Sequence, residues 1–201
     1  MAFGGIILCG GGSRRMGQPK ATLPFGPETM LQRIVRLVGD AANPIVVVSA
    51  TGQELPELPA DVILVHDREE DRGPLEGLVV GLQALKDRAE GAFVTACDVP
   101  LLKTAFVRRM IDLLGDHEIA SPSIGGFDEP LAAVYRTAVL PEAESLLAAN
   151  RRRPALLLDQ LPTRRVSAEE LADVDPQLQS LTNVNTPDEY EAALAEAGFG
   201  T

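Results

Sequence analysis

A short apolar segment that runs directly into a glycine-rich, basic loop constrains this chain more than any other feature. Ile6-Ile7-Leu8-Cys9 is followed by Gly10-Gly11-Gly12 and then by three basic residues, Arg14, Arg15 and Lys20. Consecutive glycines allow backbone N–H groups to approach an anion without obstruction by Cβ atoms, and they tolerate positive φ. The segment therefore predicts a strand that leads into a loop suited to the phosphates of a nucleoside triphosphate. A plain glycine-rich connector is the alternative.

The spacing within this loop excludes the two commonest phosphate-binding motifs. A P-loop needs Gly-x4-Gly-Lys-Ser/Thr; Gly12 and Gly17 have that separation, but Gln18 follows and the lysine comes only at Lys20. A dinucleotide-binding fingerprint needs glycine or alanine at the position that Arg15 occupies. The loop is therefore of a different class.

Short apolar segments alternate with segments of helical periodicity along the chain, which is typical of an α/β fold. Continuous apolar runs such as 45–48 suit strands that are covered on both faces. We therefore expect one domain over residues 1–201, built on a mostly parallel, three-layer, Rossmann-like sheet. The expected strands are 5–9, 45–49, 62–65, 92–96 and 131–135, and the expected helices are 30–38, 75–85, 105–114, 139–149 and 187–197.

The last expected helix carries a clear start signal. Thr186 is placed as the N-cap, Pro187 at the first helical position and Glu189 at the third, which is a capping box with the favoured proline.

Composition excludes several classes of partner. The formal net charge of −11 argues against nucleic acid, because binding a polyanion depends on neutralising its phosphates. No apolar run approaches the roughly 20 residues that span a bilayer, and no signal peptide is apparent, so we expect no membrane contact and a cytoplasmic location. His66 and His117 have no Cys/His spacing that suggests zinc. The two cysteines, Cys9 and Cys97, end expected strands and are either neighbours at the sheet edge or simply two small buried residues.

Chain order predicts that three polar features meet at one edge of the sheet. The 10–20 loop follows the first expected strand, Asp67 the third and Asp98 the fourth, and ligands of such sheets bind at the carboxyl ends of the strands. A carboxylate at Asp98 can hold Mg²⁺, a hard cation that binds one or two carboxylates together with phosphate oxygens. The alternative for Asp98 is a turn cap at the end of a strand.

Four motifs occur in the order typical of one known family. Residues 8–20 are similar to Leu-x-Gly-Gly-x-Ser-x-Arg-Met-Gly-x-x-Lys, and residues 73–77 resemble Gly-Pro-Leu-x-Gly. Residues 95–100 resemble a metal-aspartate motif, and residues 183–187 match Asn-Val-Asn-Thr-Pro. Together they resemble the molybdenum cofactor guanylyltransferases, within the sugar-nucleotide type of nucleotidyltransferases, from residue 6 to near residue 190.

The resemblance implies a fold of the nucleotide-diphospho-sugar transferase type and a specific reaction. That reaction is Mg²⁺-dependent transfer of GMP from GTP to the phosphate of molybdopterin, with or without molybdenum, releasing pyrophosphate and forming the guanine dinucleotide cofactor. It also implies transient contacts with cofactor-delivery and molybdoenzyme-maturation proteins. The alternatives are CTP with molybdopterin, a nucleotide with a sugar phosphate, and a non-catalytic nucleotide-binding regulator.

The resemblance also implies roles for individual residues. Arg15, Lys20 and Asp98 match catalytic positions, with Asp98 as the metal ligand. Cytidylyl relatives tend to have alanine at the position of Gly10, so glycine there favours guanine; Ser49 stands where relatives often have asparagine. The implied nucleotide-binding set is Leu8, Cys9, Gly10, Gly11, Lys20, Ser49, Asp67, Asp98, Asn183 and Asn185.

Four further segments concern the acceptor. Asn183 and Asn185 either orient the second substrate, complete the outer shell of the metal, or stabilise the turn before the last helix. The clusters 151–153 and 164–165 are each either a site for the molybdopterin phosphate or a solvated surface. Residues 125–130 suggest a mobile loop on the acceptor side.

Overall fold

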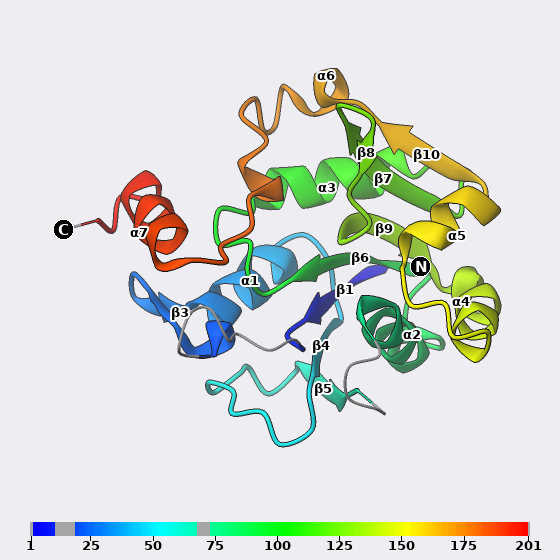
Figure 1. The fold of residues 1–201 in the computed structure, drawn as a ribbon, viewed down its shortest axis with the longest axis horizontal. Helices are drawn as coiled ribbons and strands as arrows, with labels where there is room; N and C mark the ends of the chain where they lie inside the picture. The colour runs from blue at the N-terminus through cyan, green and yellow to red at the C-terminus, as the bar shows by residue number, and fades with distance from the viewer. Residues whose placement is uncertain (1, 11–18, 68–72, 201) are drawn as a thin grey trace.

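A computed structural model of the chain describes residues 2–10, 19–67 and 73–200. A large sheet forms its centre, and helices cover both faces (Figure 1). The strands of this sheet are β1 (Phe3–Leu8), β4 (Ile45–Ser49), β5 (Ile63–His66), β6 (Gly91–Ala96), β7 (Ile119–Ile124), β8 (Phe127–Asp128), β9 (Ala132–Arg136) and β10 (Thr163–Val166).

The sheet is mostly parallel, as the apolar strand segments predict. Its eight strands run in the order β10-β7-β9-β6-β1-β4-β5, with β8 paired to β7. The pairs β1–β4, β1–β6, β4–β5 and β7–β10 are parallel. Strand β9 runs antiparallel to both of its neighbours, β6 and β7. The expected three-layer α/β class is confirmed.

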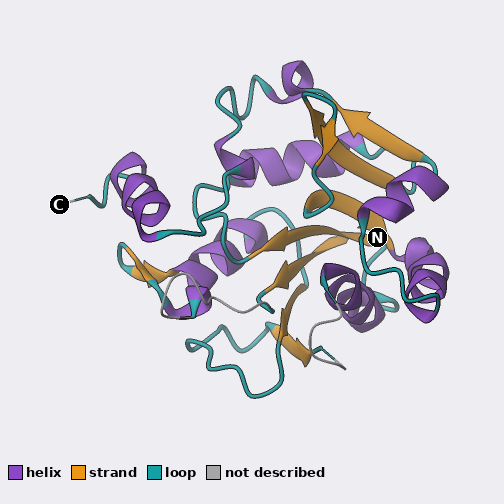
Figure 2. Cartoon of the chain, viewed as in Figure 1, coloured by secondary structure: helices purple, strands orange, loops and turns teal. Residues whose placement is uncertain are grey.

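Helices lie in two layers, one on each face of the sheet (Figure 2). Neighbouring residues of a strand point to opposite faces, so Ile7 packs in one buried cluster and Ile6 in the other. The first cluster gathers α1 (Met30–Gly39), α3 (Thr104–Leu113) and α6 (Ala168–Leu171), and the second gathers α2 (Pro74–Leu85), α4 (Leu140–Ala148) and α5 (Ala155–Gln160).

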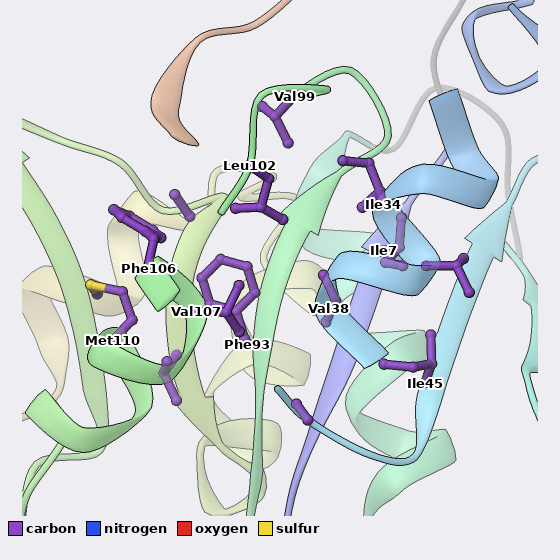
Figure 3. Close-up of a cluster of buried hydrophobic side chains, with 14 of the residues drawn as sticks. Ile7, Ile34, Val38, Ile45, Phe93, Val99, Leu102, Phe106, Val107 and Met110 are labelled. Atoms are coloured by element: carbon purple, nitrogen blue, oxygen red, sulfur yellow. The ribbon is translucent and has the colours of Figure 1, made fainter. Parts of the chain in front are cut away.

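The first cluster shows how the helices attach to the sheet. Figure 3 shows Ile34 and Val38 of α1 beside Ile7 and Ile45, and Phe106 of α3 beside Phe93. The rings of Phe93 and Phe106 meet edge to face at 6.3 Å.

A third, smaller hydrophobic cluster packs the last helix against a hairpin near the N-terminal end of the sequence. It joins the hairpin β2 (Pro24–Phe25) and β3 (Glu28–Thr29) to α7 (Pro187–Glu196), with Phe25 and Val184 fully buried. The guanidinium of Arg33 lies over the rings of Phe25 and Phe199, with its Cζ 5.1 and 5.8 Å from their centroids. This packing brings the segment before α7 to the edge of the sheet where β6 ends, because Val184 N donates to the carbonyl of Asp98 at 2.8 Å.

Each expected strand and helix is found, and its ends lie within two residues of those expected. The predicted capping box is confirmed, since Glu189 N donates to Thr186 Oγ1 and Glu189 Oε2 accepts from Thr186 N. The sequence does not predict the strands β2, β3, β7, β8 and β10 or the helices α5 and α6. Within residues 2–10, 19–67 and 73–200, no helix is long and apolar enough to cross a membrane.

Candidate active site

Four parallel strands end at the same edge of the sheet and place the candidate residues there. Gly10 follows β1, Asp67 follows β5 and Asp98 follows β6. Leu8 is paired with Ala96 and Ser49 with His66, so the strand ends are level with one another. The described part of the predicted rim is therefore assembled as chain order suggests.

Lys20, Asp98 and Asn185 meet at this rim from three distant parts of the chain. The Nζ of Lys20 donates to Asp98 Oδ2 and to Asn185 Oδ1, each at 2.8 Å. The side chains of Lys20 and Asp98 are only 16% and 19% exposed. Asp98 Oδ1 is buried and has no hydrogen-bond partner among the described residues. Two side-chain oxygens from different segments therefore surround the positive charge of Lys20.

Short-range structure holds each member of this group in place. Lys20 opens a 3-10 turn, Lys20–Thr22, directly after Pro19. Cys97 N donates to the carbonyl of Leu8, which fixes the end of β6 against β1. Asn185 N donates to Glu189 Oε2 at 2.6 Å, so the capping box of α7 also orients Asn185.

An ion pair between the half-buried Lys103 and the buried Asp175 supports the segment that leads to Asn185. Asp175 is fully buried; it accepts from Lys103 Nζ at 2.7 Å and from the backbone N–H of Ser180 at 2.8 Å. Burial alone would raise the pKa of Asp175, but the hydrogen bonds from Lys103 and Ser180 outweigh it and hold the pKa below its ordinary value. Sequence reasoning missed both Asp175 and Lys103, because an ion pair 72 residues apart leaves no local signal.

Gly10 and Asp67 are in unusually close contact. A Cβ added to Gly10 would lie 2.6 Å from Asp67 Oδ2, and one added to Gly77 would lie 3.6 Å from Asp67 Oδ1. The carboxylate thus fits between two glycines. Burial raises the pKa of Asp67, the carboxylate of the buried Glu76 raises it further, and His66 opposes the shift.

Ser49 is fully buried, and its hydroxyl is engaged within the sheet. Its Oγ lies 2.9 Å from Nδ1 of His66 on the neighbouring strand. Gln53, which the sequence did not single out, bridges the ends of β1 and β4. It donates to the carbonyl of Cys9 at 3.1 Å and accepts from Ala50 N at 3.1 Å.

Cys9 and Cys97 are buried and lie next to each other. They are therefore both neighbours at the sheet edge and small buried residues, the two alternatives that the sequence left open. They directly follow the paired residues Leu8 and Ala96, and both are free thiols. A hydrogen bond with the Cys97 thiol, together with burial, raises the pKa of Cys9. Leu8 is also buried and packs in the cluster beneath α2.

The two arginine clusters have different surroundings. Arg151–Arg153 are exposed and lie against the start of α2: a Cβ on Gly73 would be 3.3 Å from the carbonyl of Arg152. By contrast, Arg164 pairs with Glu170 at 3.0 Å, and Arg165 pairs with both Asp128 and Asp159 at 3.0 Å. Only the first cluster therefore adjoins the motif at residues 73–77.

Residues 125–130 form the turn and second strand of a hairpin. Gly125 and Gly126 take φ values of 59° and 85°, which allow the tight turn between β7 and β8. Phe127 is 76% exposed, and burial raises the pKa of Glu129. The mobility expected for this segment stays a prediction.

Several predicted site residues lie outside the described residues. Gly11, Arg14 and Arg15 belong to the undescribed part of the glycine-rich loop. Asn183 is described and exposed, next to the buried Val184. The roles assigned to all of these residues stay predictions.

Known proteins resemble this chain over nearly its whole length. The model of the MobA-like NTP transferase domain family matches residues 5–165. A probable molybdenum cofactor guanylyltransferase from Mycobacterium avium is 36% identical over 202 residues, covering 98% of this chain and 97% of the relative. One from Mycobacterium ulcerans is 34% identical over 199 residues, covering 96% and 94%.

Solved structures share the fold. Molybdopterin-guanine dinucleotide biosynthesis protein A from Archaeoglobus fulgidus has a TM-score of 0.77 at 20% identity, covering 96% of this chain and 97% of its own. The 2-C-methyl-D-erythritol 4-phosphate cytidylyltransferase of Thermus thermophilus has a TM-score of 0.73 at 16% identity, covering 98% and 100%. A Mycobacterium tuberculosis protein solved in complex with manganese has a TM-score of 0.63 at 19% identity, covering 97% and 99%. The fold is that of the nucleotide-diphospho-sugar transferases.

A family match over most of the chain and relatives at 34–36% identity lead to one assignment: this protein belongs to the molybdenum cofactor guanylyltransferases of the MobA-like nucleotidyltransferase family.

Proposed function

We propose that this protein is one nucleotidyltransferase domain that transfers GMP from GTP to the terminal phosphate of molybdopterin. The observation that carries the proposal is the group formed by Lys20, Asp98 and Asn185 at the rim where parallel strands end. A partly buried carboxylate, an amide oxygen and an ammonium at one point suit a phosphate–metal complex.

The donor set fits a divalent cation, which nucleotidyltransferases of this family normally need. Asp98 offers a buried oxygen without a partner among the described residues, and Asn185 offers an amide oxygen beside it. Mg²⁺ prefers such oxygen ligands together with phosphate oxygens and water. Bound there, it would offset negative charge on the α-phosphate in the transition state.

The side chains themselves would act by positioning and charge. An oxygen of the molybdopterin phosphate attacks the α-phosphorus of GTP in line. The bond from that phosphorus to the bridging oxygen of the β-phosphate breaks, and pyrophosphate leaves. Lys20 and Arg15 would neutralise the triphosphate and the leaving pyrophosphate. No enzyme nucleophile is required, because both reactants are held together at the rim.

Guanine specificity would rest on Asp67 and Gly10. The Watson–Crick edge of guanine presents N1–H and an amino group, and one carboxylate can accept from both. The missing Cβ of Gly10 leaves room for the carboxylate, since that atom would be only 2.6 Å from Asp67 Oδ2. Ser49 is buried against His66, so a role in base contact would need its hydroxyl to turn from that partner.

The acceptor phosphate would bind beside the start of α2. Arg151–Arg153 are exposed there, against Gly73, and α2 has twelve residues with Pro74 at its first turn. Positive side chains next to a helix N-terminus favour an anion. The second cluster is the weaker candidate, because Arg164 and Arg165 lie on β10, the strand at the other end of the sheet order from β5, rather than beside Gly73.

Pyrophosphate release tests the proposal. We expect release with Mg²⁺ and GTP but not with ATP, CTP or UTP, and only when molybdopterin is present. Asp98→Asn should remove it while leaving the thermal unfolding transition cooperative. Release with CTP would assign the protein to the cytidylyl branch, and release without the pterin but with a sugar phosphate would change the acceptor.

A further inference from the structure

We propose that Lys20 occupies the divalent-cation position while the protein is free of nucleotide, so that metal binding requires Lys20 to leave. The inference depends on the proposed function in two respects: the assignment of Asp98 as a metal ligand, and the binding of the nucleotide phosphates by the segment that ends at Lys20. It adds an order of events: the nucleotide phosphates draw Lys20 away, and the cation then binds.

The ammonium of Lys20 binds the two oxygen atoms that would ligate a metal ion. Lys20 Nζ is 2.8 Å from Asp98 Oδ2 and 2.8 Å from Asn185 Oδ1. One of these oxygens belongs to a carboxylate and the other to an amide, and both are typical ligands of a hard cation. Both oxygens come from segments far from Lys20 in sequence, so their convergence on one cation is a feature of the fold.

The position has little water to screen a second positive charge. The side chains of Lys20 and Asp98 are 16% and 19% exposed, and Asp98 Oδ1 is buried. A divalent ion on the same two oxygens would lie a few ångströms from the ammonium. Like charges at such a short distance repel strongly where little water screens them. The ammonium and the metal ion therefore exclude one another.

Lys20 is placed so that the nucleotide can move it. It stands at the end of the 10–20 loop and opens the short Lys20–Thr22 turn, with a flexible four-carbon stem. A triphosphate bound by that loop offers several anionic oxygens as new partners for the ammonium. Nucleotide and metal binding are then coupled, and the coupling is equal in both directions.

The test is a titration of nucleotide-free protein with Mn²⁺. Binding is measured as the decrease of the free Mn²⁺ signal in electron paramagnetic resonance. Lys20→Met removes the charge and the donor, and Lys20→Gln removes the charge but keeps an N–H donor for Asp98 and Asn185. We expect both variants to bind Mn²⁺ about ten-fold more tightly than the wild type, or more. We also expect Mn²⁺ to raise their unfolding temperature more.

Three controls separate this effect from a general change in charge. Lys86→Met removes an exposed lysine at the end of α2 and should leave Mn²⁺ affinity unchanged. Lys20→Arg keeps the positive charge and should bind Mn²⁺ as weakly as the wild type. Adding Asp98→Asn to Lys20→Gln should remove the gain, which ties it to this site.

Equal Mn²⁺ affinity for the wild type and a folded Lys20→Gln variant would overturn the inference. So would wild-type protein that binds Mn²⁺ equally well with and without a non-hydrolysable GTP analogue. Both outcomes are independent of acceptor chemistry. If instead guanylyl transfer fails but Lys20→Gln binds Mn²⁺ more tightly, the proposed function is wrong and the inference stands.

Discussion

Replacing Gly10 with alanine should weaken GTP binding through a single displaced carboxylate. The new Cβ would lie 2.6 Å from Asp67 Oδ2, whereas ordinary contacts begin near 3.4 Å, so the two atoms must separate by about 0.8 Å (3.4 − 2.6). Gly10 does not have the positive φ that would strain an alanine, so the effect is one of space rather than of backbone conformation.

The size of the effect follows from what Asp67 would lose. A hydrogen bond to a charged group contributes about 1.5–3 kcal/mol. At about 1.4 kcal/mol per factor of ten, a carboxylate moved out of register with guanine should cost roughly ten- to hundred-fold in GTP affinity. Asp67 lies at the rim rather than in the core, so we expect the free energy of unfolding to change by less than about 1 kcal/mol.

Isothermal titration calorimetry with GTP and CTP measures this directly. Gly39→Ala is a matched control, because among the described residues beyond its own helix and chain neighbours its Cβ would approach only Ile45, at 3.9 Å, and GTP affinity should not change. If folded Gly10→Ala binds GTP within two-fold of the wild type, the role given to Asp67 is wrong. A gain in CTP affinity of the same variant would add that this position helps to choose the base.

Three further perturbations test other parts of the site. Asp98→Ala should abolish turnover while GTP still binds; measurable turnover in a folded variant would contradict its assignment. Asp175→Ala should lower the free energy of unfolding, measured in urea, by about 1–3 kcal/mol, because it leaves the buried N–H of Ser180 without its acceptor and Lys103 without its partner. The folded-state pKa of Asp175 lies below its ordinary value of 3.8. Its contribution to the free energy of unfolding is therefore present above that pH and is lost as the pH falls through the folded-state pKa. Asp175→Asn should flatten this dependence of stability on acid pH. Arg152→Ala should raise KM for molybdopterin about ten-fold with GTP affinity unchanged, whereas Arg165→Ala should alter neither; equal effects of the two would refute the choice between the clusters.

The elements that the sequence predicts well are those with their own local signal. The strand Ile45–Ser49 begins with four consecutive apolar residues and is buried along its whole length, as a strand covered on both faces should be. The helix that follows Thr186 is marked by its capping box. Strands β7 and β10 lack such a signal, since Pro122 interrupts the first and Arg164 and Arg165 lie in the second. Both depend on pairing with neighbours that local periodicity does not reveal.

The same distinction applies to the site. Chain order predicts that Gly10, Asp67 and Asp98 reach one rim, because parallel strands end together. The position of Asn185 depends on the packing of α7 against Phe25, and it meets Lys20 across 165 residues. The contact of Gly10 with Asp67 likewise appears only in three dimensions, although the glycine itself is visible in the sequence.

The central claim is tested most directly by following the α-phosphate of GTP. The protein would be incubated with Mg²⁺, molybdopterin and GTP labelled at that phosphate, and the products separated by chromatography. The account predicts label in a pterin-containing product, formed in equal amount to pyrophosphate and absent with Asp98→Asn. Label that stays in GTP with active molybdopterin present, or that appears in a product without the pterin, would contradict it.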